Sequence, residues 1–253
     1  MSNIFLKIKR IIAKIFTIIL TPRYSFLLFQ IRYIERFTGI DTFFLSPRRF
    51  LIYIIECITL NDLKRIKLHD YGNYKLLKNK IPKNPIVYSG GVGTNISFDL
   101  ELLRIHGGKV RLFDPTPSSI KYMHKFKNNK KIKFYPTALY HKNERVKIYF
   151  DPTNRVKSNS ISNFLNFNKK SFYKVNAKNI FYFVKKNKDQ KIDILKLDIE
   201  GVAEDLLIHT LKNNIKPKQI IFALEVPMNY LKFFYFIKKF LLIIKILKKD
   251  YNL

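Results

Sequence analysis

The stretch 86-IVYSGGVGTNISFDLELL-103, followed by 109-KVRLFDPTP-117, decides the fold. It predicts an apolar strand, a glycine-bearing turn, a helix and a second strand that ends on an acid, which is typical of an α/β domain. Glycine lets the backbone of the turn approach a ligand without interference from a Cβ atom. Asp114 lies about 20 residues beyond the turn, where a carboxylate can accept hydrogen bonds from ribose hydroxyls. The stretch therefore predicts a nucleoside cofactor site.

The glycine spacing distinguishes between two kinds of cofactor. Glycines stand at positions 90, 91 and 93, but position 96 is isoleucine, where a dinucleotide-binding turn has a third glycine. A cofactor with a ribose and no phosphate fits better, and S-adenosylmethionine is the candidate. An ordinary strand-turn-helix corner remains the alternative for these residues alone.

From residue 85 onward, strands and helices are expected in alternation. Strands are expected at 86–89, 109–113, 132–138, 192–198 and 219–225, and helices at 95–106, 117–127, 202–213 and 229–248. This alternation predicts a Rossmann-like, doubly wound and mostly parallel sheet with helices on both faces. Ligands bind such sheets beyond the carboxyl ends of the strands, near the switch point of the strand order.

The rest of the chain suggests two additions to this domain. Residues 1–80 are expected to form a helical, basic amphipathic extension, and residues 81–253 the Rossmann-like domain. Residues 140–190 become polar after an initial strand and are expected to be an insertion that covers the acceptor site as a lid. The last residues, 250-DYNL-253, resemble the beginning of another strand, so the C-terminal strands of such a fold are expected to be missing.

A second group of acids follows the apolar strand in 192-IDILKLDIEGVAEDLL-207. Asp198 and Glu200 are two positions apart, so both can face one ligand from an extended chain. Burying two carboxylates is costly unless they bind something. Glu225, at the end of the next strand, is a candidate third acid. The alternative is that Asp198 and Glu200 only stabilise the start of the following helix.

Three segments together carry a family resemblance: 87-VYSGGVGTNISFD-99, 112-LFDPTPSS-119 and 194-ILKLDIEG-201. They resemble the FkbM family of S-adenosylmethionine-dependent methyltransferases, and the third segment is the most specific match. The resemblance implies a Rossmann-like methyltransferase fold and methylation of an oxygen, often a sugar hydroxyl of a natural product or surface polysaccharide.

The resemblance also implies roles for individual residues. Those placed at the cofactor are Ser89, Gly91, Gly93, Asn95, Asp114 and Pro115, and Asp198 and Glu200 match the family's acids at the end of the fourth strand. Three positions depart from the family pattern. Ser89 and Asn95 stand where aspartate is usual, and Ala203 replaces a common glutamate. The change at Asn95 removes a charge near the methionine part of the cofactor.

Methyl transfer needs an aligned oxygen nucleophile and a group that takes its proton. We expect Asp198 to orient or deprotonate the acceptor, with Glu200 in support. A divalent metal held by these acids and Glu225 is a disfavoured alternative, and the five histidines show no metal-ligand spacing. Only His141 is a candidate base among them, and a solvated loop position is favoured for it.

The charge of +30 and the pI of about 10.1 invite a nucleic-acid interpretation. However, the lysines are spread along the whole chain together with abundant Ile, Asn, Phe and Tyr, as codon drift in an AT-rich genome also produces. Asp-Ile-Glu-Gly at the fourth strand end differs from the Asn/Asp-Pro-Pro-aromatic motif common in amino-methylating enzymes. A nucleic-acid methyltransferase is therefore the disfavoured alternative. The lone Cys57 excludes a disulfide framework and suits a reducing, cytoplasmic compartment.

Residues 4–19 combine an isoleucine face with a lysine and arginine face. Such a helix can lie on an anionic membrane surface, so a peripheral location on the inner face of the membrane is expected. Packing of the same face on the catalytic domain is an equal alternative. No cleavable signal is recognisable, and the longest charge-free run, 15–22, is too short to span a bilayer. The departures from the family pattern leave open a third hypothesis, a truncated, non-catalytic, membrane-associated remnant.

Overall fold

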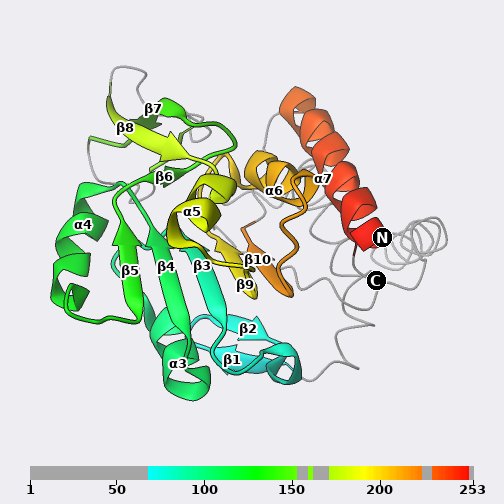
Figure 1. Ribbon diagram of the computed structural model, residues 1–253. Coiled ribbons are helices and arrows are strands. Elements are labelled where there is room, and N and C mark those ends of the chain that lie inside the picture. The colour runs from blue at the N-terminus through cyan, green and yellow to red at the C-terminus, as the bar shows by residue number, and fades with distance from the viewer. Residues whose placement is uncertain (1–67, 153–158, 162–170, 224–229, 251–253) are drawn as a thin grey trace, which may run out of the picture.

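A five-stranded parallel sheet forms the centre of the molecule (Figure 1). The computed structural model describes residues 68–152, 159–161, 171–223 and 230–250. The strands lie in the order β10-β9-β3-β4-β5, and every neighbouring pair is parallel. Their bounds are β3 Ile86–Gly90, β4 Lys109–Phe113, β5 Ile132–Tyr135, β9 Ile194–Leu197 and β10 Gln219–Phe222. The predicted α/β class with a mostly parallel sheet is confirmed, and the order is consistent with a Rossmann-like methyltransferase fold.

The chain order of these strands defines the switch point of the sheet. The first strand of the sheet, β3, has the second strand, β4, on one side and the fourth, β9, on the other. The connection from β3 to β4 and the connection from β9 to β10 therefore run in opposite directions across the sheet. Loops that leave the carboxyl ends of β3 and β9 diverge here, which leaves room for a ligand.

Helices cover both faces of the sheet, as the sequence predicts. Their bounds are α3 Ser97–His106, α4 Pro117–Met123, α5 Ile180–Asn187, α6 Ala203–Lys212 and α7 Tyr230–Asp250. Side chains of α5, α6 and α7 join one buried apolar cluster with Tyr88 and Leu195. Side chains of α3 and α4 join the other cluster with Val87 and Ile194. Adjacent residues of one strand thus serve opposite layers, because successive side chains of a strand point to opposite faces.

The region before β3 corrects part of the predicted helical extension. Residues 69–76 form a hairpin of β1 (His69–Tyr71) and β2 (Tyr74–Leu76), followed by the short 3₁₀-helix η1 (Lys78–Lys80). Gly72 makes the turn with φ +54°, and the buried residues Tyr71, Tyr74 and Leu76 pack beneath the sheet. The turn glycine and the short alternating pattern favour a hairpin here. The rest of the predicted extension, including residues 4–19, lies outside the described residues.

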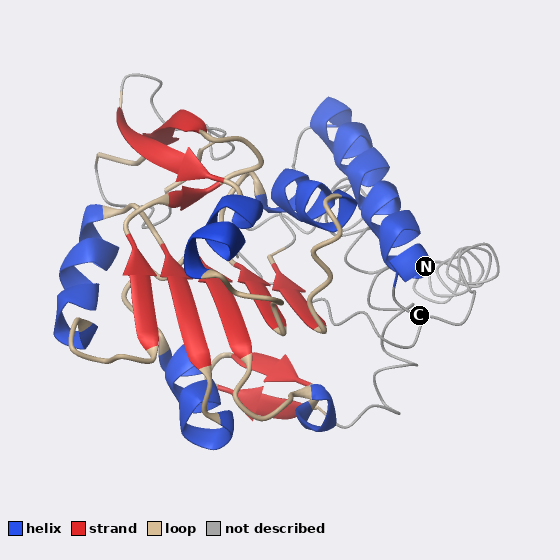
Figure 2. Ribbon diagram, viewed as in Figure 1, coloured by secondary structure: helices blue, strands red, loops and turns tan. Residues whose placement is uncertain are grey.

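The predicted insertion contains more regular structure than expected. Its strands β7 Glu144–Tyr149 and β8 Phe172–Lys178 form a second sheet, in the order β6-β8-β7, with β6 Ala138–Leu139, which lies just before the predicted range. This sheet lies beyond the carboxyl ends of the parallel strands (Figure 2). Within the predicted range 140–190, α5 is not part of a lid, because Ile180 and Phe183 pack in the main core. The side chain of Asn179 caps α5 by accepting a hydrogen bond from Tyr182 N at 2.9 Å.

A buried ion pair joins β4 to the segment that follows α5. Arg111 Nε and Nη2 donate to the two carboxylate oxygens of Asp189 at 3.1 and 3.0 Å, and Tyr88 Oη donates to Asp189 Oδ2 at 2.9 Å. Arg111 and Asp189 are 7% and 8% exposed. Three donors therefore satisfy the carboxylate, which is the condition under which a buried charge is tolerated.

Candidate active site

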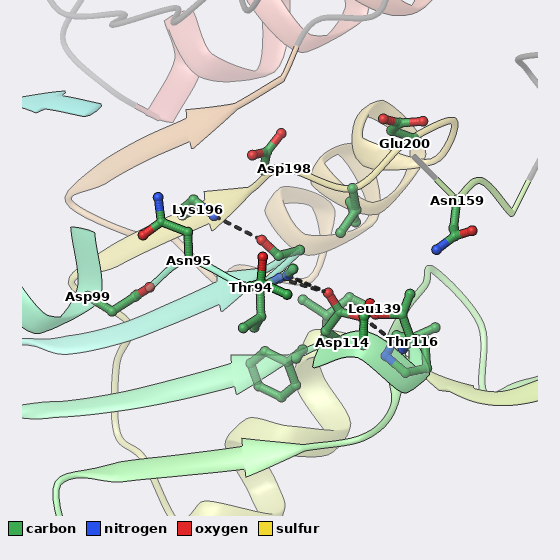
Figure 3. A pocket seen from close by; sticks show the side chains of 18 of the residues that line it. Thr94, Asn95, Asp99, Asp114, Thr116, Leu139, Asn159, Lys196, Asp198 and Glu200 are labelled. Atoms are coloured by element: carbon green, nitrogen blue, oxygen red, sulfur yellow. Dashed lines mark hydrogen bonds between the residues drawn. The ribbon is translucent and has the colours of Figure 1, made fainter. Parts of the chain in front are cut away.

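A cavity of about 330 Å³ lies at the switch point of the sheet. Its walls come from the β1–β2 hairpin, the glycine turn after β3, the start of α3, the carboxyl ends of β4 and β9, and the insertion (Figure 3). The volume falls in the range of about 300–1,000 Å³ that is usual for small-molecule sites. The cavity combines backbone groups of the turn with several charged side chains, so it is suited to a polar ligand.

Asp114 follows β4 and holds the glycine turn in place. Its Oδ2 accepts hydrogen bonds from Val92 N at 3.0 Å and from Gly93 N at 2.9 Å. Its Oδ1 accepts from Thr116 N at 2.8 Å and from Thr116 Oγ1 at 2.6 Å. The carboxylate lines the cavity and is 6% exposed. Asp114 therefore lies where a ribose is expected, but four protein donors already occupy its oxygens.

Glycine is needed at two positions of the turn for different structural reasons. Gly91 has φ +78°, and a Cβ atom there would lie 1.9 Å from the backbone oxygen of Asp198. The close approach of the β3 and β9 ends therefore requires glycine at this position. Gly93 has φ +54°, but a Cβ atom there would meet no atom within 4 Å. Its side faces open space, so the backbone beside it is accessible.

Asp198 and Glu200 line the same cavity, beyond the carboxyl end of β9. Tyr74 Oη, from the hairpin, donates to Asp198 Oδ2 at 2.6 Å. Glu200 forms a backbone bridge with Ser160 of the insertion, and Ser160 Oγ donates to the Glu200 backbone oxygen at 3.2 Å. The insertion is thus attached to the segment that carries both acids. Glu225, the candidate third acid, lies outside the described residues.

Three further predicted cofactor residues have different environments. Pro115 lies in the cavity wall. Asn95 also lines the cavity, and its Oδ1 accepts a hydrogen bond from Ser97 N at 2.9 Å, so this side chain supports the start of α3. Ser89 is fully buried at the end of β3 and is not among the residues that line the cavity.

Sequence reasoning missed three side chains of the cavity: Tyr74, Asp99 and Lys196. Asp99 lies in the first turn of α3 and is 2% exposed, and Lys196 lies within β9 and is 4% exposed. A signal for Lys196 was present, since it is the single charged residue in the strand Ile194–Leu197, where every position is buried. Tyr74 had no comparable signal, because its role depends on where the hairpin packs.

The described part of the site has neither a histidine in its lining nor a group of metal-ligating side chains. No histidine of the described residues lines the cavity, and His141 packs against Tyr140 outside it, with 4.1 Å between the ring centroids. Within the same residues, no three His, Cys, Asp or Glu side chains are grouped as a metal site requires. Nor is any helix of this part of the chain long and apolar enough to cross a membrane.

Fold and site together define an α/β enzyme domain with its ligand cavity at the switch point of a parallel sheet. Residues 91–252 match the family model of the methyltransferase FkbM domain, and this match covers more than half of the chain. The chain belongs to the FkbM methyltransferase domain family, as the sequence motifs predict. The comparisons with curated proteins and with solved structures give no match.

Proposed function

We propose that this methyltransferase uses S-adenosylmethionine to methylate a hydroxyl oxygen, and that the acceptor is a carbohydrate. The observation that carries the proposal is that one cavity contains both the glycine turn with Asp114 and the two acids Asp198 and Glu200. A cofactor site and an acceptor site must adjoin for a group to pass between them. The choice of a sugar hydroxyl rests on the family resemblance.

The residues around Asp114 fit the ribose of such a cofactor after one small rearrangement. Thr116 Oγ1 also lies 2.7 Å from Ser119 Oγ, and either atom can be the donor in that contact. If Thr116 turns its proton to Ser119, Asp114 Oδ1 gains the capacity to accept a hydrogen bond from a ribose hydroxyl. The backbone donors of Val92 and Gly93 continue to hold the other carboxylate oxygen.

When bound, S-adenosylmethionine supplies an electrophilic methyl group. On the acceptor side, the Asp198 carboxylate orients the hydroxyl and takes its proton as the oxygen reacts. Tyr74 fixes the direction of this carboxylate through the hydrogen bond to Oδ2. Glu200 lies further toward the insertion and binds another hydroxyl of the acceptor. Asn159 and Ile161 line the cavity from the insertion and help to exclude water.

The cofactor part of the proposal is tested by calorimetric titration with S-adenosylmethionine. We expect Asp114→Asn to weaken binding roughly 10-fold or more, because it replaces the charged carboxylate that accepts the ribose hydrogen bond with a neutral amide. Thr116→Val is the matched control, since it leaves Asp114 Oδ1 open to the ribose and is expected to bind at least as well as the wild type. No binding by folded wild-type protein would contradict the proposal and favour the non-catalytic remnant.

The acceptor part is tested by transfer of radiolabelled methyl to a panel of saccharides, with RNA and DNA included as alternative acceptors. We expect label in alkali-stable methyl ethers, and Asp198→Asn is expected to abolish most of it while cofactor binding persists. Label that appears only in RNA or DNA would show that the acceptor is a nucleic acid and not a carbohydrate.

We also propose that the enzyme works at the inner face of the membrane through residues 4–19, which rests on their amphipathic sequence. Co-sedimentation with anionic liposomes is expected to fall when residues 1–22 are deleted. Unchanged co-sedimentation would count against this location.

A further inference from the structure

Two opposite charges line the β9 side of the cavity, away from Asp114. Lys196 Nζ donates a hydrogen bond to Gly91 O at 3.2 Å and lies 5.0 Å from the centre of the Tyr74 ring. Asp99 reaches the same region from the first turn of α3. Both side chains are almost fully buried, at 4% and 2% exposure. The cavity wall thus contains a buried cation and a buried anion, both labelled in Figure 3.

These two charges do not form an ion pair with each other. In the part of the chain that the structure describes, no nitrogen of Lys196 lies within 4.0 Å of an Asp99 oxygen, and Asp99 Oδ1 has no hydrogen-bond partner. Burial raises the pKa of the Asp99 carboxyl to about 6, while the Lys196 ammonium and the Ser89 hydroxyl oppose the rise. Buried charges are costly unless each is paired. A ligand that carries both signs would pair both of them.

The order of the sheet places this charge pair opposite the ribose site. Asp114 follows β4, Lys196 belongs to β9, and β3 with Gly91 lies between them. A ligand with its ribose at Asp114 and its length along the cavity therefore passes over Gly91 and reaches the pair. Its far end meets a carboxylate from α3 and an ammonium from β9.

We propose that Asp99 and Lys196 form a subsite for a zwitterionic α-amino acid group. Asp99 accepts hydrogen bonds from the α-ammonium, and Lys196 donates to the α-carboxylate. The inference rests on the proposed function, in which that group is the amino acid end of the cofactor. It also accounts for Asn95, which precedes α3, because Asp99 in the first turn of that helix supplies the negative charge that position 95 lacks.

The test compares two adenosyl ligands by calorimetry. S-adenosylhomocysteine carries the amino acid group, and 5′-methylthioadenosine has the same nucleoside and sulfur without it. We expect wild-type protein to bind the first ligand at least 10-fold more tightly. Asp99→Asn and Lys196→Met are each expected to lower the affinity for S-adenosylhomocysteine roughly 10- to 100-fold. Each is expected to change the affinity for 5′-methylthioadenosine less than about 2-fold.

Matched controls remove the same charges elsewhere. Asp70→Asn alters an exposed carboxylate of the hairpin, and Lys109→Met alters an exposed residue at the amino end of β4. Neither is expected to change the affinity for either ligand. Decarboxylated S-adenosylmethionine, which keeps the ammonium, is expected to be sensitive to Asp99→Asn and insensitive to Lys196→Met.

The outcomes separate this inference from the function on which it rests. Equal affinity of wild-type protein for both ligands would refute the subsite and leave the cofactor assignment standing. If the variants lower the affinity for both ligands equally, Asp99 and Lys196 only maintain the fold, which also refutes the subsite. Failure of wild-type protein to bind either ligand would overturn the proposed function and the subsite together. If a variant does not fold, the comparison of the two ligands on wild-type protein can still refute the subsite.

Discussion

The close approach of the β3 and β9 ends at Gly91 leads to a quantitative prediction. Alanine at this position has to adopt φ near +78°, which costs about 1–2 kcal/mol for a residue with a Cβ atom. In addition, the separation between the new Cβ and the Asp198 backbone oxygen has to grow from 1.9 Å to at least 3.0 Å. This oxygen belongs to the backbone that pairs with β3 through Asp198 N and Gly90 O at 3.0 Å. Such overpacking costs about 1–3 kcal/mol more.

We therefore expect Gly91→Ala to lower the free energy of unfolding by roughly 2–5 kcal/mol. Gly93→Ala is the matched control, because Gly93 also has positive φ but open space beside it, and only about 1–2 kcal/mol is expected. The assay is urea unfolding followed by far-UV circular dichroism, since the chain contains no tryptophan. A Gly91→Ala variant that is no less stable than Gly93→Ala would refute the reasoning.

Three further predictions concern buried charges and their partners. Because the pKa of Asp99 is raised from 3.8 to about 6 in the folded protein, the folded state binds this proton more tightly, and stability falls as pH rises from about 4 to 6. Over this pH range, the free energy of unfolding of the wild type, measured by urea titration, is expected to fall by roughly 3 kcal/mol relative to that of Asp99→Asn. If the free energies of unfolding of the two proteins change in parallel with pH, the prediction is contradicted. Asp189→Asn leaves the buried Arg111 guanidinium without its anion and is expected to cost about 3–5 kcal/mol, whereas a loss under 1 kcal/mol would show that water reaches the pair. Tyr74→Phe removes the hydrogen bond to Asp198 and is expected to reduce methyl transfer roughly 10-fold with unchanged cofactor affinity; a weakened cofactor instead would place Tyr74 at the cofactor.

Local sequence signals predicted the parallel sheet well. The strands at 86–90, 109–113 and 194–197 are short, mostly buried segments bounded by glycine or acid, and such segments are typical of parallel strands that are covered on both faces. Because all these strands run in one direction, their carboxyl ends meet at one edge. The sequence alone therefore indicated that Asp114 and Asp198 lie at the same end of the sheet.

The partners of these acids depended on the tertiary structure. Hydrophobic periodicity reports which residues are buried, but not which distant element covers them. Tyr74 is 124 positions from Asp198, and the two meet because the hairpin packs beside α3 and β3. A short hairpin also has too few residues for its alternation to stand out from the apolar helical pattern before it.

The sequence by itself determined the α/β class, the family and the end of the sheet at which ligands bind, because these depend on local strand, turn and acid signals. Only the tertiary structure decided that Asp99 and Lys196 face one cavity without forming a pair, and that Asp114 supports the glycine turn. These features depend on distances of a few ångströms between elements from different parts of the chain. No pattern along the sequence encodes such distances, since they arise when the layers pack against each other.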